Sequence, residues 1–302
     1  MKFSRALFFY GSPVVAVLAC LLNLPEIILL LKRYRKMSKL HVKGRVVPVL
    51  LLISLAASDF LVGLTVILIK IIRYLLDEGI IPTSEFNRKM HKVLLFLFLR
   101  LSLLTSVFNL LALTIDRLCS IRNPILYRTR VSSRHGFAAV LASWMLASVL
   151  IAIQYYFSIY EDMEPIKYRL LIFPVTIIPA SSCFILCYIK ILNNMSMHGQ
   201  AIRGQLQTAE KCPLYILERE LKISRFAATV VSVFMVCWLP LAFIGLVNIL
   251  GVDIDNELPN TMFILAFTNS VLDPLIYFGF KEKESLRKKI SQMTARIFKR
   301  NH

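Results

Sequence analysis

Long apolar runs constrain this chain more than any other feature of its sequence. A membrane helix needs about 20 mostly apolar residues to cross about 30 Å of hydrocarbon. Seven runs meet that length, at residues 6–31, 46–69, 93–115, 136–157, 170–189, 226–250 and 262–280. A backbone in lipid must satisfy its own hydrogen bonds, and the sequence lacks the alternating pattern of barrel strands. The runs therefore predict an all-α membrane protein, a bundle of seven transmembrane helices.

The distribution of charge predicts how the bundle lies in the membrane. If the N-terminus is outside, the inner segments are 32–45, 116–135, 190–225 and 281–302, and they hold 26 of the 36 Lys and Arg residues. Short cytoplasmic loops are enriched in these residues. We therefore expect a multi-pass plasma-membrane protein with a cytoplasmic C-terminus. A signal peptide cleaved at Cys20 is the weaker alternative, because the apolar run continues to Leu31.

Composition excludes several classes of protein. Hydrophobic residues make up 57% of the chain, against about 45–50% in soluble domains. Nucleic acid is therefore not an expected partner, although the net charge is +18. The sequence contains no Gly-rich phosphate loop, paired metal-ligand spacing or nucleophile–base set, so we predict no enzymatic activity.

Four of the runs each contain one charged residue, and the two aspartates are the clearest functional candidates. These residues are Glu26, Asp59, Arg100 and Asp273. A charged residue at the centre of a membrane helix costs about 2.5–3.5 kcal/mol on insertion scales, so it marks a functional site by default. A structural carboxylate that is hydrogen-bonded between helices is an equally good interpretation of either aspartate.

The third run has an inward stripe that ends in arginine. Counting at about 100° per residue, Leu103, Ser106 and Leu110 lie on the face that Arg117 continues. The adjacent Asp116 can pair with that arginine. Alone, such a pair at the end of a helix is more often an ordinary solvated ion pair.

Two further runs combine proline with functional groups. Trp238 stands two residues before Pro240 in the sixth run. Proline removes a backbone hydrogen bond and kinks a helix. The seventh run places Asn269, Ser270 and Asp273 beside Pro274. These two proline-containing helices, together with Asp59, predict a bundle with two alternative arrangements of its helices.

The C-terminal residues 281–302 form an amphipathic stretch, separate from the seven-helix domain expected over residues 1–280. Its apolar positions recur at helical spacing among basic residues, at Leu286, Ile290, Met293 and Ile297. This pattern is typical of a helix on an anionic membrane surface, so lipids of the inner leaflet are expected partners.

Motifs in the seven runs resemble, in order, those of one receptor family. They are Asn23; Leu55-Ala56-Ala57-Ser58-Asp59; Asp116-Arg117-Leu118; Trp144; Tyr188 with Ile191; Cys237-Trp238-Leu239-Pro240; and Asp273-Pro274-Leu275-Ile276-Tyr277. Together they resemble the rhodopsin-like (class A) G-protein-coupled receptors along nearly the whole chain. Each motif is weak alone, but seven in register are a strong signal.

The resemblance implies a function and a switch. The family transmits extracellular ligand signals to heterotrimeric G proteins. Arg117 would pair with Asp116 and with Glu220 at the base of the sixth helix, which swings outward on activation. The residues implied in coupling and switching are Asp116, Arg117, Glu220, Trp238, Pro240, Pro274 and Tyr277.

The resemblance also implies one cation and no other cofactor. The family's inactive state holds sodium in a pocket that corresponds here to Asp59, Ser106, Asn269, Ser270 and Asp273. A hard cation with oxygen ligands is chemically reasonable there. Because the family usually pairs one Asp with an Asn, the second carboxylate leaves protonation of one group as an alternative.

The sequence departs from the family at positions that bear on the ligand. Leu99 stands where amine receptors carry Asp, and 262–280 contains no Lys for a retinal Schiff base. We therefore expect a receptor that is neither aminergic nor an opsin. Lys92 replaces the usual Cys of the outer disulfide, which leaves open a diverged receptor with constitutive or lost signalling.

Arg100 is the expected anchor for the ligand, with Leu99, Leu103 and Trp238 beside it. Its guanidinium suits a carboxylate or phosphate, and the leucines supply apolar contact, as for an acidic or lipid-like ligand. An equally weighted alternative has Arg100 snorkelling to the outer interface or pairing with Glu161, Asp162 or Glu164.

A transporter or channel is the alternative class of protein. Transporters often carry inverted repeats with broken helices at matching positions in two halves. The seven runs and their non-recurring motifs argue against that architecture.

Overall fold

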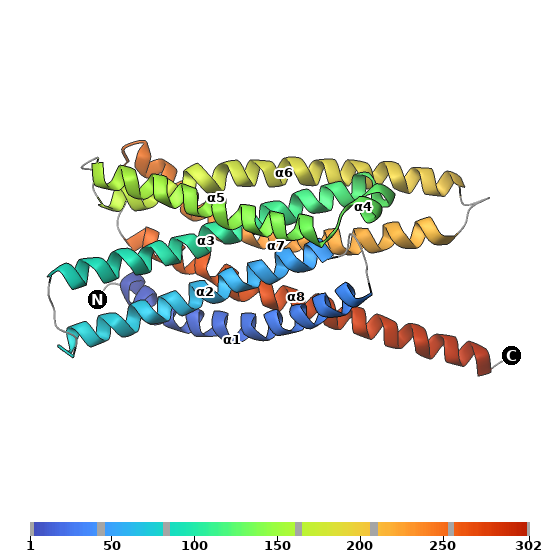
Figure 1. The fold of residues 1–302 in the computed structure, drawn as a ribbon, viewed down its shortest axis with the longest axis horizontal. Helices are drawn as coiled ribbons and strands as arrows, with labels where there is room; N and C mark the ends of the chain where they lie inside the picture. The colour runs from blue at the N-terminus through green and yellow to red at the C-terminus, as the bar shows by residue number, and fades with distance from the viewer. Residues whose placement is uncertain are drawn as a thin grey trace.

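The computed structural model describes the backbone of residues 3–40, 46–80, 85–160, 165–205, 211–252 and 257–300, and these form only helices. The helices are α1 (Phe3–Lys39), α2 (Val46–Asp77), α3 (Glu85–Arg122), α4 (Pro124–Arg130), α5 (Ser133–Tyr160), α6 (Pro165–Gln205), α7 (Lys211–Ile249) and α8 (Glu257–Arg300) (Figure 1). All except the short α4 are long and apolar enough to cross a membrane. The predicted all-α bundle of seven spans is confirmed.

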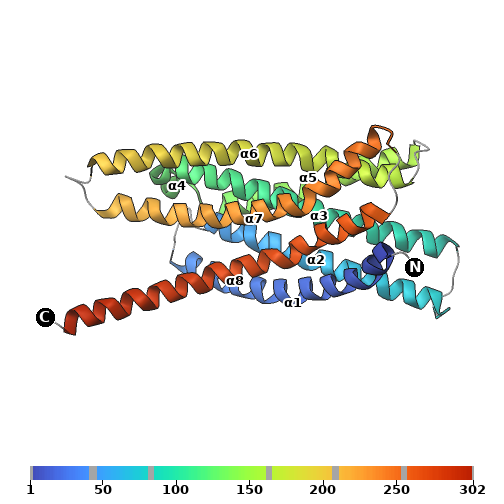
Figure 2. The same cartoon turned by 180° about the vertical axis from the view of Figure 1, so that it is seen from behind.

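The long helices run side by side, with α3 in the middle of the bundle. Helix α3 packs against α2, α5, α6 and α7, whereas α1 packs against α2 and α8. The first and last helices are therefore neighbours. Figures 1 and 2 show the end of α1, all of α4 and the far end of α8 at the same end of the bundle. We call this the α4 end.

Two elements differ from the sequence analysis. The segment 116–135, which the hydropathy assigns to a loop, contains α4, a helix of 7 residues with Pro124 at its start. Proline is favoured there because the first helical N–H has no intrahelical partner. Helix α8 continues without a break through residue 280 to Arg300. Its backbone therefore does not mark the expected domain boundary, and the position of the tail on the inner leaflet stays a prediction.

Helix α1 buries a narrow stripe whose members recur every three or four residues. The apolar members of this stripe, Ala16, Ala19 and Leu30, are at most 3% exposed. Its two polar members are also buried, with Asn23 0% and Glu26 4% exposed. This spacing is one face of an α-helix. The stripe packs between α2 and α8, so two polar side chains of α1 face the interior of the bundle rather than lipid.

Helices α1 and α2 approach closely at Gly63. A Cβ atom on this glycine would lie 2.6 Å from the carbonyl oxygen of Ala16 and 2.8 Å from the Sγ of Cys20. The first of these atoms is backbone, so the clash is relieved only if one helix moves. Small residues at membrane helix interfaces permit such close packing.

We expect Gly63→Ala to destabilise the bundle, because the added methyl group forces α1 away from α2. Overpacking of this kind costs about 1–3 kcal/mol. Gly279→Ala is the matched control, since a Cβ there meets no atom within 4 Å. Thermal unfolding of the purified variants measures the difference. A Gly63→Ala protein with the Tm of the wild type would contradict the close approach.

Candidate functional site

A buried polar cluster occupies the interface of α2, α3 and α8. Asp59 of α2 accepts two hydrogen bonds on the same oxygen, Oδ1, from Ser106 Oγ at 2.8 Å and from Ser270 Oγ at 2.9 Å. Asn269 Nδ2 donates to Asp273 Oδ2 at 3.1 Å within α8. The structure therefore brings together all five residues that the sequence assigns to a cation pocket, and each is at most 5% exposed.

Two residues outside the predicted set extend this cluster. Ser58 Oγ lies 3.1 Å from Ser106 Oγ. From α1, the Asn23 amide donates to the carbonyl oxygen of Ser270 at 2.7 Å and to that of Ala19 at 2.8 Å. The Ser270 carbonyl is the group that Pro274, four residues later, leaves without its helical N–H donor. Asn23 thus replaces a backbone hydrogen bond that proline removes.

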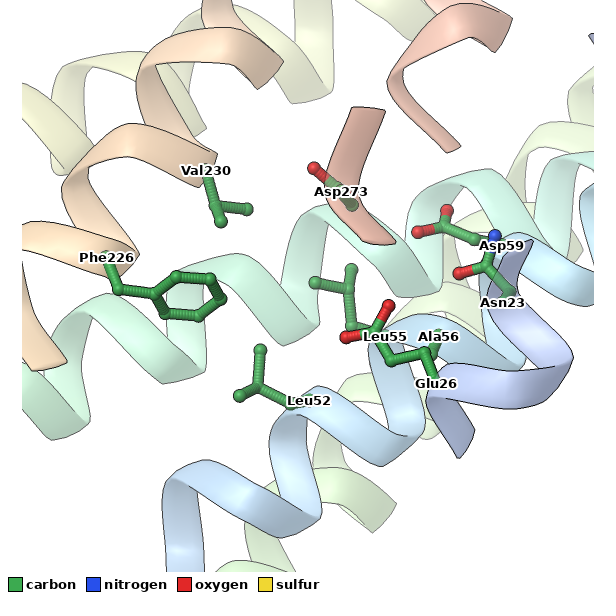
Figure 3. A pocket seen from close by; sticks show the side chains of 9 residues that line it. All are labelled: Asn23, Glu26, Leu52, Leu55, Ala56, Asp59, Phe226, Val230 and Asp273. Atoms are coloured by element: carbon green, nitrogen blue, oxygen red, sulfur yellow. The ribbon is translucent and has the colours of Figure 1, made fainter. Parts of the chain in front are cut away.

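A small cavity adjoins the cluster and is lined by residues of four helices. Its polar lining consists of Asn23, Glu26, Asp59 and Asp273, and Figure 3 shows their side chains around it. The apolar lining consists of Leu52, Leu55, Ala56, Phe226 and Val230. The cavity measures about 10 Å³, roughly the space of one water molecule.

Several oxygens at this site accept no hydrogen bond. They are Asn23 Oδ1, Asp59 Oδ2, Asn269 Oδ1 and Asp273 Oδ1, and all are buried. Buried acceptors without a donor are costly, but carboxylate and amide oxygens are also the ligands that hard cations prefer. Within the ranges that the structure describes, no three His, Cys, Asp or Glu side chains lie close enough together to hold a metal ion.

A second polar site lies at the end of α3. Arg117 Nε donates to Asp116 Oδ2 at 3.1 Å, and Arg117 Nη2 donates to the same oxygen. Tyr127 of α4 donates its hydroxyl to Asp116 Oδ1, and Arg117 Nη2 lies 3.5 Å from that hydroxyl. Arg117 is 1% exposed and Asp116 is 9% exposed. The pair is therefore buried, and the ordinary solvated ion pair does not describe it.

Tyr127 is a residue that the sequence analysis did not select. The only local signal for this helix is Pro124 at its start. An aromatic residue within a basic segment has no distinctive pattern that would select Tyr127. The side chain of Glu220, the other expected partner of Arg117, lies outside the described residues. The predicted Arg117–Glu220 pair therefore stays a prediction.

Aromatic residues connect α7 to its neighbours. Trp238 is 2% exposed and stacks on Phe234 at 5.9 Å between ring centroids. Nearer the α4 end, Phe226 of α7 contacts Tyr277 at 6.3 Å and Phe280 at 5.3 Å, both edge to face. Pro240 and Pro274 lie inside α7 and α8, which continue through them.

A second small cavity lies between α3, α6 and α7. It is lined by Arg100, Leu103, Leu104, Val107, Thr176, Ile177 and Trp238. Three of the four expected ligand-pocket residues thus share one cavity. Leu99 is buried but does not line it. Thr176 and Ile177 come from α6, which the sequence did not associate with Arg100, and residues 161–164 with the acidic alternative partners lie outside the described ranges.

Comparison with known proteins places the chain beside membrane receptors. Residues 27–277 match the family model of the 7 transmembrane receptor (rhodopsin family). Trace amine-associated receptor 5 of Mus musculus is 29% identical over 75% of this chain and 69% of its own length. Adenosine receptor A2b of Bos taurus is 24% identical over 75% of this chain and 74% of its own length.

Proposed function

Because the chain belongs to the rhodopsin family of seven-transmembrane receptors, we propose that it transmits an extracellular ligand signal to heterotrimeric G proteins. The family match over residues 27–277 carries the proposal. The buried Asp116–Arg117 pair supports it, because this pair lies at the position through which the family contacts its G protein. Receptors of this family are generally not enzymes, and we assign no catalytic activity to this chain.

The N-terminus lies outside and the α4 end faces the cytoplasm in the proposed topology. Exposed basic residues at the end of α1 support this orientation, because positive charge favours the cytoplasmic side. They are Lys32, Arg33, Arg35, Lys36 and Lys39. In this topology the amphipathic stretch 281–302 extends from α8 along the cytoplasmic surface and contacts anionic lipids.

The described conformation corresponds to the closed state of the switch. Asp116 and Tyr127 hold the Arg117 guanidinium inside the bundle. Phe226 holds the lower half of α7 against α8 through Tyr277. Activation moves α7 outward, separates these rings and frees Arg117 for the G protein. Glu220 adds a further closed-state contact in this scheme.

We expect Tyr127→Phe to raise basal signalling about fivefold, since the lost hydroxyl contact to Asp116 exists only in the closed state and is worth about 1 kcal/mol. Guanine-nucleotide exchange in membranes without ligand measures the effect. The control is Tyr74→Phe, because Tyr74 is 61% exposed. Basal exchange equal to that of the wild type would show that α4 does not restrain Arg117.

The polar cluster serves as the cation site of the closed state. Asp59, Ser106, Asn269, Ser270 and Asp273 supply hydroxyl, amide and carboxylate oxygens in a buried position. Sodium is the ion that the family resemblance implies. Its binding stabilises the closed state if outward movement of α7 opens the cluster to water.

The ligand is acidic or lipid-like and is held by Arg100. The two relatives named above are called a trace amine-associated receptor and an adenosine receptor, but Leu99 gives this chain no carboxylate at the amine-binding position of the family. Arg100 instead lines a cavity whose other walls are largely apolar and include Trp238. This cavity measures about 10 Å³, room for roughly one small group, so the carboxylate head would enter it beside Arg100 and the apolar body would require the helices to move apart.

Arg100→Gln should strongly weaken the binding of such a ligand. Arg100→Lys should weaken its binding less, because lysine keeps the charge without the bidentate fork. A charge-assisted pair is worth about 1.5–3 kcal/mol, which corresponds to about 10- to 150-fold in affinity. Fatty acids and peptides with a free C-terminal carboxylate are the probes. Equal potency of the active probe on all three proteins would leave the snorkelling interpretation.

Nucleotide exchange tests the proposed function directly. Membranes from cells that express the protein are compared with membranes from untransfected cells, with G protein added, and ion flux is measured in the same cells. Exchange above background without ion flux is the expected result. Ion flux without exchange at any probe concentration would favour the transporter or channel.

A further inference from the structure

The last turns of α8 extend beyond the seven-helix bundle. Helix α8 continues without a break to Arg300, and residues 281–300 include neither Pro nor Gly. Figures 1 and 2 view the molecule from opposite sides, and both show these turns apart from every other described helix. The fold therefore leaves the amphipathic stretch 281–302 without a neighbouring helix among the described residues.

The apolar positions of this stretch form one narrow stripe. Leu286, Ile290, Met293 and Ile297 recur at i, i+4, i+7 and i+11. At about 100° per residue they fall within an arc of about 60°, and at about 1.5 Å per residue they span about 16 Å of helix. Anchors with such spacing are typical of a helix that a protein partner takes into an apolar groove.

The charge of the stretch indicates that its partner is acidic. Residues 285–302 contain six Lys or Arg and no Asp or Glu. A basic amphipathic helix of this kind is typical either of a membrane-surface segment or of a target of calcium-sensor proteins. Two features of α8 distinguish between these partners.

The first feature is the position of basic residues around the helix. Lys288 and Lys299 are three turns apart in the sequence and share one side of the helix, about 160° from the apolar stripe. If the stripe entered a lipid surface, these two positions would lie on the side away from the lipid. A protein groove that closes around the helix contacts both sides, so this distribution favours a protein partner.

The second feature is the course of α8. A helix that crosses a membrane lies along its surface only if the chain bends where it leaves the lipid. Figures 1 and 2 show α8 running onward past the bundle at the α4 end, and its helix has no break there. In the proposed topology this direction leads into the cytoplasm. The described conformation thus offers the stretch to soluble proteins, whereas contact with the inner leaflet requires a bend.

We propose that the amphipathic stretch 281–302 is a docking site for an acidic calcium-sensor protein whose apolar groove opens when calcium binds. Sensors of this kind expose a Met-rich groove in the calcium-bound state. The inference goes beyond the proposed signalling function and rests only on its topology, in which the α4 end faces the cytoplasm. Calcium thereby selects between two arrangements of the stretch, because a sensor that covers the stripe removes it from anionic lipids.

Binding of calmodulin to the purified full-length protein in detergent tests the proposal. The fluorescence anisotropy of labelled calmodulin should rise with receptor concentration when calcium is present, and should not rise after calcium is chelated. Ile290→Gln should weaken this binding at least about tenfold, because it removes a central apolar anchor. Ala295→Gln is the matched control, since position 295 lies opposite the stripe and receives the same side chain. It should stay within about threefold of the wild type, the effect expected away from the anchors.

A second pair of measurements separates a protein groove from a lipid surface. The combined change of Lys288→Gln and Lys299→Gln should weaken calmodulin binding at least about fivefold, since both charges meet the acidic partner. Receptor in nanodiscs that contain phosphatidylserine should bind calmodulin more weakly than receptor in phosphatidylcholine alone, because the anionic lipid competes for the stripe. Thermal unfolding of each variant confirms that the bundle is intact.

The outcomes separate this inference from the proposed function. Absence of calcium-dependent binding, in detergent and in phosphatidylcholine nanodiscs alike, overturns the docking site and leaves the inner leaflet as the partner of the stretch. Binding that persists without calcium, or that Ile290→Gln and Ala295→Gln weaken equally, reflects attraction between charges without a groove and also overturns it. Receptor in detergent is accessible from both ends, so these results do not depend on topology. Nucleotide exchange tests the proposed function separately.

Discussion

We expect Arg117→Ala to abolish ligand-stimulated and basal nucleotide exchange, leaving it at the background of untransfected membranes. Arg117 is 1% exposed in the described conformation, and in our proposal its guanidinium is the group that the outward movement of α7 presents to the G protein. Alanine removes both that contact and the charge. We therefore expect a loss of at least about 100-fold, corresponding to about 2.7 kcal/mol, rather than a partial decrease.

The control for this variant is Arg122→Ala, because Arg122 is an exposed arginine at the end of the same helix. Removing one partner of a buried ion pair also destabilises the fold, so exchange is normalised to receptor at the cell surface. Arg117→Lys separates charge from geometry, since lysine keeps the charge. Exchange by Arg117→Ala within a factor of two of the wild type would remove Arg117 from the coupling mechanism.

Asp59→Asn and Asp273→Asn should each eliminate most of the cation-dependent rise in Tm, and the double variant should lose no more than either alone. Both carboxylates line the same cavity, so an ion that contacts both is lost when either is neutralised. Residues that share one ligand are non-additive in this way. We expect the cation concentration for half of the effect to rise at least about tenfold, a change of about 1.4 kcal/mol.

The unfolding experiment includes Asp77→Asn as a control, because Asp77 is exposed at the end of α2. Additive losses, with a cation response preserved in each single variant, would make the two aspartates independent structural residues. That result would remove the cation site from the proposal and leave the receptor function untouched.

Hydropathy was sufficient to predict the seven spans, because crossing a membrane requires length and apolar character that are local properties of the chain. The inward orientation of Asp59, Ser106 and Asp273 was also predictable. A polar side chain that faces lipid is costly, whichever neighbours its helix has. Their meeting in one buried cluster agrees with the resemblance of the ordered motifs to the receptor family. Local sequence therefore determines which residues enter the bundle interior.

Contacts that depend on how helices rotate against each other were not predictable. Glu26 was visible as a charge in the first span, but only the packing of α1 between α2 and α8 brings it to the same cavity as Asp273. Tyr127 lies on a helix of 7 residues, too short for a periodic pattern. Thr176 lines the same cavity as Arg100 because α6 packs against α3. The residue pattern of a single helix does not predict such a contact between helices.

The bond between Asn23 and the Ser270 carbonyl has a consequence for biogenesis. It joins residues 247 positions apart, so α1 is synthesised before its partner on α8 exists. Until α8 is inserted, the amide of Asn23 lacks this acceptor. Helix α8 in turn contains the Ser270 carbonyl, to which Pro274 cannot donate a hydrogen bond. Freed backbone groups in membrane helices are tolerated when a neighbouring helix satisfies them. Chains that stall before the seventh span therefore keep the Asn23 bond to the Ala19 carbonyl but leave the second amide N–H of Asn23 without its Ser270 acceptor.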